Sequence, residues 1–300
     1  MFKNKIIITL TLTSILSLYA QDTLSYDYAL DFLKLGVAAR ACAMGEAFVA
    51  VADDGSAYFW NPAGLGSLSN PSIMFTHAEW LFDTRFECLG GSLPFKFGTF
   101  TPHIMYLGSG EIERTDQYGR EIGTYENYDI AAGIAYGIQP EKGLHFGFTA
   151  KFIYEKLDNY YASGLSFGIG FLYRTPIGLS LGLSGMNIGK GVKFIDTRNN
   201  QPLTIRFGLA YQGSVHSLDF IPALDLVYDR NIKINLGCEI VIVNILAIRG
   251  GYRIGLNQQC FTAGLGVRSP ILLKKFSLDY ALAGFTELDL GHRFSLSFDF

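Results

Sequence analysis

The chain has 300 residues, a formal net charge of −3 and only 17% charged residues, whereas an average soluble domain carries about 25%. This balance excludes a basic nucleic-acid-binding protein, and no stretch after residue 20 supplies the roughly 18 apolar residues that a membrane helix needs. Because the mean hydropathy is nevertheless positive, at +0.22, a large soluble β protein and a membrane β-barrel remain as the two classes to separate.

Residues 1–20 predict a secretory signal peptide. Lys3 and Lys5 form a basic region, residues 6–18 form an apolar core, and Ala20 precedes the expected cleavage site. A signal anchor is the alternative. Residue 21 is Gln rather than Cys, so we do not expect a lipoprotein.

Residues 21–70 show no strand alternation and predict a compact, mostly helical segment. Asp53 and Asp54 are interpreted as turn or capping residues rather than as a carboxylate pair for acid–base catalysis. Asn61 is expected to cap the following turn, with Pro62 at its first position. The aromatic residues 58–60 predict a contact that fastens this segment to its surroundings, with a hydrophobic ligand as the alternative partner.

From residue 71 onward, apolar side chains alternate with small or charged ones, which is typical of strands with one apolar face. A sandwich core would not bury the charged face, whereas a barrel lumen accepts it. The apolar face, which we expect to contact lipid, includes Phe146, Phe148, Phe152, Phe207 and Phe294. The opposite face, which we expect to line the lumen or to form ion pairs inside it, includes Lys151, Arg206, Asp219, Asp225, Arg249 and Arg253.

About fourteen such runs follow one another, an even number, as bacterial barrels require. They begin near residues 72, 85, 97, 126, 143, 164, 177, 203, 217, 232, 245, 259, 275 and 291. Residues 71–300 therefore predict an all-β transmembrane protein: an antiparallel outer-membrane β-barrel of the bacterial cell, with residues 21–70 as a short helical plug, or hatch, in its lumen.

Connections of alternating length support this fold. Residues 139–143, 175–176 and 213–217 predict short turns, while residues 108–126 and 187–202 predict long polar loops. Short periplasmic turns and longer outer loops are typical of outer-membrane barrels. The last predicted strand ends at Phe300, the usual form of the signal that directs barrel insertion.

The sequence contains no convincing catalytic or metal-binding motif. Two G-x-S-x-G matches, around Ser166 and Ser180, lie inside predicted strands rather than at a strand-to-helix turn, so they do not indicate a hydrolase. The five histidines are scattered and the four cysteines form no CxxC pair, which predicts free buried thiols. We therefore expect no enzyme, no cofactor and no metal site.

Residues 32–65, FLKLGVAARACAMGEAFVAVADDGSAYFWNPAGL, resemble the start of the PorV/PorQ family of outer-membrane proteins, within the wider FadL-like group of fourteen-stranded barrels. Cys42 and Glu46 depart from the family pattern, which commonly has a second Gly at position 46. The matching positions are Gly36, Arg40, Met44, Gly45, Ala47, Phe48, Ala52, Asp53, Asp54, Trp60, Asn61, Pro62, Ala63 and Gly64.

The resemblance implies that this segment folds into the barrel as a hatch, with Asn-Pro-Ala at its turn. It also implies one of two functions. The first is a role in type IX protein secretion or cell-surface attachment, with secretion components or secreted cargo as partners. The alternative is a FadL-like channel for hydrophobic small molecules, with a hydrophobic ligand. Outer-membrane lipids would surround the barrel in both cases.

Overall fold

The computed structural model describes residues 30–79, 84–194, 196–255, 260–269, 275–285 and 288–300. The predicted signal peptide, residues 1–20, and the first part of the predicted hatch, residues 21–29, lie outside the described residues. Among the described residues, no helix is long and apolar enough to cross a membrane.

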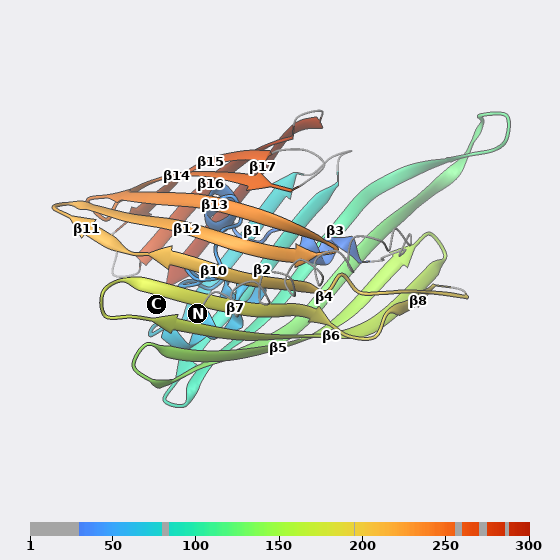
Figure 1. Cartoon of the computed structure of the whole chain (residues 1–300). Coiled ribbons are helices and arrows are strands. Elements are labelled where there is room, and N and C mark those ends of the chain that lie inside the picture. Colours follow the sequence, from blue (N-terminus) through green and yellow to red (C-terminus); the bar gives the residue numbers. More distant parts are fainter. Residues whose placement is uncertain (1–29, 80–83, 195, 256–259, 270–274, 286–287) are drawn as a thin grey trace, which may run out of the picture.

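In the described residues, fourteen antiparallel strands close into a barrel (Figure 1). Closure follows from two pairings: β1 lies beside β17, and β10 lies beside β12. The barrel strands are β1 (Ser72–Glu79), β2 (Arg85–Phe95), β3 (Gly98–Thr115), β4 (Glu121–Glu141), β5 (Leu144–Leu157), β6 (Tyr160–Arg174), β7 (Leu179–Ile188), β10 (Thr204–Tyr211), β12 (Leu218–Asp229), β13 (Asn231–Ile242), β14 (Leu246–Ile254), β15 (Cys260–Ser269), β16 (Lys275–Phe285) and β17 (Leu288–Asp299). The fold class predicted from the sequence is confirmed, and these strands correspond in order to the fourteen predicted runs.

Three short strands complete the sheet structure of the part of the chain described. β8 (Val192–Phe194) and β9 (Thr197–Asn199) form a small hairpin between β7 and β10, and β11 (Gly213–Val215) pairs with β12. The predicted loop 187–202 therefore contains a hairpin, and the predicted turn 213–217 contains a strand.

The prediction of a loop over residues 108–126 is wrong. β3 and β4 continue through most of this stretch and pair as far as Thr115 opposite Glu121, so their hairpin projects beyond the other strands (Figure 1). Polar residues occupy both faces of this part, and without an apolar face the alternation that marks a strand is lost. Backbone pairing outside the bilayer requires no such face.

Successive side chains along the strands point alternately to the outside and the inside of the barrel, as expected. Phe148 is 45% exposed and Phe207 42% exposed on the outside, whereas their neighbours Thr149 and Arg206 are buried inside. A row of outward tyrosines crosses β3, β4, β5 and β6, with ring centroids 6.1–6.3 Å apart: Tyr106, Tyr128, Tyr154 and Tyr161. Such a row marks a membrane–water interface.

At the opposite end of the barrel, Phe95 stacks on Phe97 with ring centroids 5.5 Å apart, and Phe100 packs against both at 6.0 Å. This end also holds the short turns and the start of β1. We assign it to the periplasm, and the tyrosine row to the outer leaflet, because outer-membrane barrels carry their longer connections outside.

Candidate functional site: the hatch and its seat in the barrel

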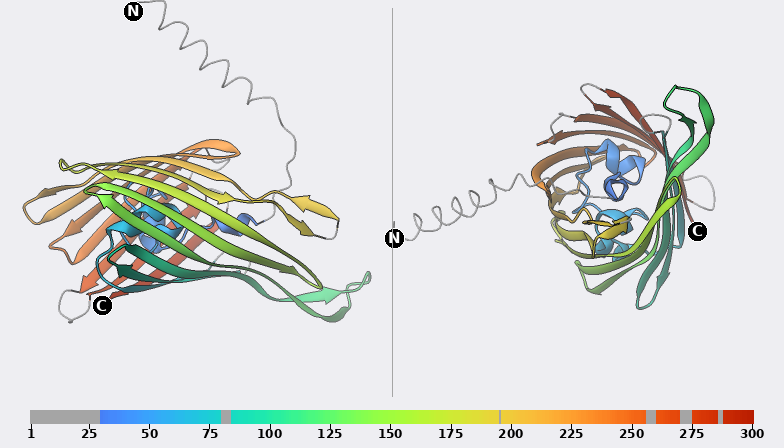
Figure 2. Two further views of the ribbon diagram at one scale, coloured as in Figure 1. Left: turned by 90° about the horizontal axis from the view of Figure 1, so that it is seen from below. Right: turned by 90° about the vertical axis from the view of Figure 1, so that its right-hand side faces the viewer.

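Residues 30–70 lie inside the barrel, where Figure 2 shows them as the blue and cyan segment enclosed by the strands. They form four short helical elements: η1 (Asp31–Lys34), α2 (Ala39–Ala43), α3 (Ala57–Trp60) and η2 (Pro62–Ser67). We call this segment the hatch. Its side chains make up most of the buried apolar core, and Phe48, Tyr58 and Trp60 are among the largest fully buried ones.

Glycines on the inner wall form the seat of the hatch. At these positions a Cβ atom would overlap hatch atoms, mostly its backbone, so the two chains are in direct contact. Several face one another on neighbouring strands, which makes continuous smooth patches. The glycines of this seat are Gly137, Gly147, Gly170, Gly182, Gly208, Gly237, Gly251 and Gly264.

The Asn-Pro-Ala element lies on the part of this seat formed by β5 and β6. Asn61 caps η2 as expected, its side-chain oxygen accepting the Ala63 N–H at 3.2 Å. Its amide nitrogen donates to two carbonyls at 2.9 Å each, that of Val49 in the hatch and that of Phe171 in β6. Asn61 therefore joins two hatch segments to the wall, which is more than a helix cap requires.

A second anchor lies on β12. The buried Asp225 carboxylate accepts the backbone N–H groups of Phe48 at 2.9 Å and Val49 at 3.0 Å. These two amides have no helical partner, and a carboxylate satisfies both at once. Asp225 was predicted to face the lumen, and it lies there as an acceptor for the hatch backbone.

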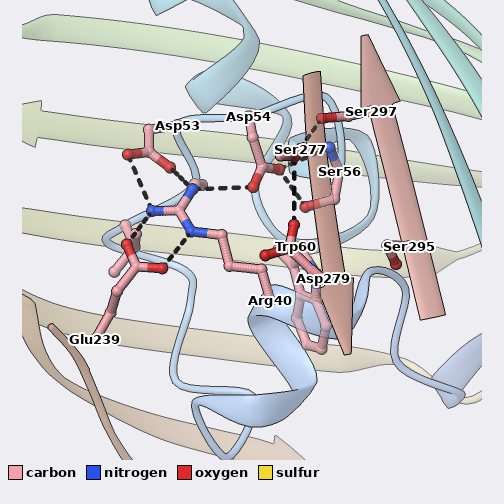
Figure 3. Close-up of polar contacts among 12 residues, drawn as sticks. Arg40, Asp53, Asp54, Ser56, Trp60, Glu239, Ser277, Asp279, Ser295 and Ser297 are labelled. Carbon is pink, nitrogen blue, oxygen red and sulfur yellow. Dashed lines mark hydrogen bonds and ion pairs between the residues drawn. The ribbon is translucent and has the colours of Figure 1, made fainter. Parts of the chain in front are cut away.

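Arg40 is the centre of an ion network between hatch and wall (Figure 3). Its guanidinium donates to both carboxylate oxygens of Glu239 on β13, at 2.9 and 2.8 Å. The same group contacts Asp53 at 2.5 Å and Asp54 at 3.0 Å. The network continues along the wall through Arg249, which contacts Glu239 at 2.5 Å and Asp279 at 2.7 Å.

This network corrects the interpretation of the two aspartates. The sequence indicated turn or capping residues, but both carboxylates also contact one guanidinium. Asp54 does form a local turn, accepting the Ser56 N–H at 2.9 Å, while its other oxygen contacts Arg40.

Electrostatics of the hatch follow from this arrangement. Burial alone would raise the pKa of Asp53, but the adjacent Arg40 guanidinium outweighs it and holds that pKa below its ordinary value. Burial would lower the pKa of Arg40, and the surrounding carboxylates instead raise it well above its ordinary range. Both groups are therefore charged at neutral pH, and each charge is compensated inside the barrel.

The two departures from the family pattern also contact the wall. Glu46, in a left-handed conformation with φ of 63°, contacts Arg253 of β14 at 2.7 Å. Cys42 accepts a hydrogen bond from Arg293 at 2.6 Å, and burial raises the pKa of its thiol to about 11. All four cysteines are free, but Cys238 is exposed on the outer face, contrary to the expectation that all would be buried.

The remaining predicted lumen residues have separate polar partners. Lys151 is buried and donates to the Asn187 side chain at 2.9 Å. The Arg206 guanidinium lies over the Trp60 ring, 5.2 Å from its centroid. Asp219 accepts a hydrogen bond from Ser214 and borders a polar cavity of about 650 Å³ at the periplasmic end of the hatch, which Arg40, Asp53 and Glu239 also line. In the described part of the chain, no cluster of three or more His, Cys, Asp or Glu side chains is arranged for a metal ion.

Sequence reasoning missed Glu239, Asp279 and the glycine seat. Glu239 and Asp279 occupy inward positions of their strands, so period-two alternation contained the signal that they face the lumen. Glycines at inward positions of successive strands were a second signal, because they mark where another backbone can approach the wall. Neither pattern indicates which hatch residue lies opposite.

Comparison with known proteins supports the fold. No protein-family model and no curated protein matches the sequence. The structure is similar to the toluene transporter TodX of Pseudomonas putida, with a TM-score of 0.60 and 12% identity over 86% of this chain and 97% of that one. It is also similar to the toluene transporter TbuX of Ralstonia pickettii, with a TM-score of 0.59 and 10% identity over 88% of this chain and 97% of that one.

A Pseudomonas aeruginosa FadL homologue aligns with a TM-score of 0.51 and 10% identity, over 86% of this chain and 96% of that one. Identities this low establish the fold alone. The chain thus has the FadL-like fold of a fourteen-stranded outer-membrane barrel with an N-terminal helical segment, as predicted, whereas its placement in the PorV/PorQ branch stays a prediction.

Proposed function

We propose that this protein is an outer-membrane channel for hydrophobic small molecules, gated by the hatch. One observation carries the proposal: the lumen is filled by a separate apolar segment that touches the wall largely through glycines and is held there by polar anchors. A porin-type barrel keeps a polar, water-filled lumen instead. Two barrels of the same fold named above are toluene transporters, which supports the same substrate class.

The geometry suggests how the gate works. Where glycines and backbone meet, both surfaces are smooth, so the hatch can slide along this part of its seat once the polar anchors release. The polar anchors include Arg40 to Glu239, Asn61 to Phe171, and the Phe48 and Val49 amides to Asp225. Glu46 to Arg253 and the Gly45 amide to Thr262 are further anchors. Passage of a substrate then requires displacement of the hatch rather than diffusion through a permanent pore.

A disulfide between hatch and wall tests this proposal. A Cβ built at Gly55 lies 3.7 Å from the Met74 Cβ on β1, within the range that a disulfide requires. Cells that produce the Gly55→Cys/Met74→Cys variant should take up the hydrophobic dye N-phenylnaphthylamine only after reduction, whereas cells with the unmodified protein should take it up under both conditions. The two single-cysteine variants are the controls.

Selectivity is the second readout. Uptake of the hydrophilic substrate nitrocefin should not exceed that of cells lacking the protein. Equal dye uptake by the oxidised and reduced forms of the double variant would show that the hatch does not gate the channel. Equal entry of nitrocefin and dye would show a general pore instead.

A second candidate is the type IX secretion or attachment role implied by the PorV/PorQ resemblance, and the projecting β3–β4 hairpin favours it. Tyr118 and Ile122 are 73% and 61% exposed on this arm, where a protein partner has access to them. In a strain in which the gene is disrupted, a secretion role predicts loss of surface-attached proteins. An unchanged surface proteome would contradict it.

A further inference from the structure

A groove opens on the barrel where β6 extends past its neighbour β7. The pairing of β6 with β7 begins at Phe167 opposite Ile188, so residues 160–166 continue beyond it. The β8–β9 hairpin, whose first strand β8 is labelled in Figure 1, lies beside this stretch. Gln201 donates to the Leu165 carbonyl at 2.8 Å, and a Cβ at Gly164 would lie 3.0 Å from Val192. The groove between β6 and the hairpin encloses about 610 Å³.

One wall of this groove is apolar and continuous with the lipid-facing surface. Tyr161, Leu165 and Phe167 line it from the outward face of β6 and are 69%, 57% and 38% exposed. Phe167 stacks on Phe148 of β5, with ring centroids 6.0 Å apart. An acyl chain leaving the groove would therefore continue along the band of side chains that faces the membrane.

The other wall is cationic. Lys190, Lys193 and Arg198 line it, all of them exposed. Lys193 and Arg198 lie directly opposite each other on β8 and β9, an arrangement of like charges that destabilises a hairpin. Asp196 approaches Lys193 at 3.7 Å but is 92% exposed, so water screens this pair. An anion bound in the groove would relieve the repulsion.

The tyrosine row places the groove at the depth of lipid headgroups. Tyr161 belongs both to this row and to the groove. Lys156, paired with Tyr161 across β5 and β6, lies 5.3 Å from the Tyr128 ring centroid. Aromatic and basic side chains at one level are typical of the interface where headgroups lie.

We propose that this groove binds a phosphate-bearing lipid of the outer leaflet. Lys190, Lys193 and Arg198 contact the phosphate, and one acyl chain packs along Leu165 and Phe167. The site is separate from the hatch, so it does not depend on what the channel transports. Its occupant also stabilises the β8–β9 hairpin, which lies beside the part of β6 that β7 does not reach.

Native mass spectrometry of the full protein in detergent tests this site, with bisphosphorylated lipid A as the probe and phosphatidylcholine as the zwitterionic comparison. The Lys190→Gln/Arg198→Gln variant should bind lipid A roughly tenfold more weakly than the unmodified protein. The matched control is Lys96→Gln/Lys142→Gln, which removes two exposed lysines at the periplasmic end and should leave binding unchanged. Heat-modifiable migration on a gel confirms that both variants are folded.

A separate variant tests the apolar wall of the groove. Leu165→Asn should weaken lipid A binding several-fold while leaving both basic groups in place, because the acyl chain loses its contact. Equal losses in the two double variants would overturn the proposal, as would equal affinity for phosphatidylcholine and lipid A. Unchanged binding by Leu165→Asn would reduce the site to a surface that attracts anions without seating a lipid.

Discussion

Arg40 in the hatch and Glu239 on β13 form a bidentate ion pair inside the barrel, with hydrogen bonds of 2.9 and 2.8 Å. The two residues are 199 positions apart in the chain. Glu239 has a fully buried side chain, so its charge depends on arginine partners for compensation. This pair couples closure of the lumen to the fold of the wall.

Glu239→Gln should therefore loosen the hatch. Breaking a buried ion pair by removing one partner costs about 3–5 kcal/mol, and we expect the lower end because Arg40 keeps Asp53 and Asp54. The loss is measured as the change in free energy of unfolding by urea in lipid vesicles. Glu87→Gln, which removes an exposed carboxylate near His77, should change that free energy by less than about 1 kcal/mol. Equal effects of the two variants would show that the network does not hold the hatch.

Acid should loosen the hatch in a defined range, because Asp53 holds the guanidinium of Arg40, which pairs with Glu239 on the wall. The pKa of Asp53 lies below its ordinary value of 3.8, so its contribution to stability is complete above that value and is lost as the pH falls through the lower, folded-state pKa. Fluorescence of the buried Trp60, in a Trp80→Phe background, should shift to the red below about pH 4. Asp53→Asn should show part of this shift already at neutral pH, since Arg40 keeps Glu239 and Asp54 as partners. Constant emission down to pH 2 would contradict this account.

Two neighbouring glycines on β14, Gly251 and Gly250, form a matched pair for testing the glycine seat. A side chain at Gly251 would meet the hatch, whereas a side chain at Gly250 would alter only the strand. A Cβ at Gly251 would overlap the Gly45 backbone, whereas a Cβ at Gly250 would have its nearest neighbour at 4.0 Å. Gly251→Ala should displace the hatch locally and expose Cys42, whose modification by iodoacetamide is followed by mass spectrometry. Gly250→Ala should leave Cys42 as unreactive as in the unmodified protein. Similar reactivity in both variants would argue against the glycine seat.

The two faces of the wall should differ in their tolerance of charge. Phe148→Arg places a cation on the lipid face, at a cost of about 2–4 kcal/mol if the site is near the midplane. Ser297→Arg is the control, since Ser297 lines the polar periplasmic cavity. Thr149, although it faces inward, is unsuitable as a control because it is fully buried against Gly168. Folded yield in lipid vesicles should fall for Phe148→Arg only, and equal yields would mean that the faces are assigned wrongly.

The barrel strands, their inward and outward faces and the Asn61 cap were predictable from the sequence alone. Each depends on residues within a few positions of one another, because side chains alternate along a strand and a cap bonds within one turn. Phe148 and Lys151 therefore lie on the faces assigned to them. The local signal failed in the β3–β4 hairpin, where backbone pairing continues beyond the membrane without an apolar face to mark it.

Only the tertiary structure decided what the hatch touches. Arg40 and Glu239 carry opposite charges, but nothing near either one in the chain shows that they meet, since closure of fourteen strands brings them together. The inward glycines have a reason only once the hatch backbone lies against them. Alternation determined which way each side chain points, and the register of the closed barrel determined which residues lie opposite one another.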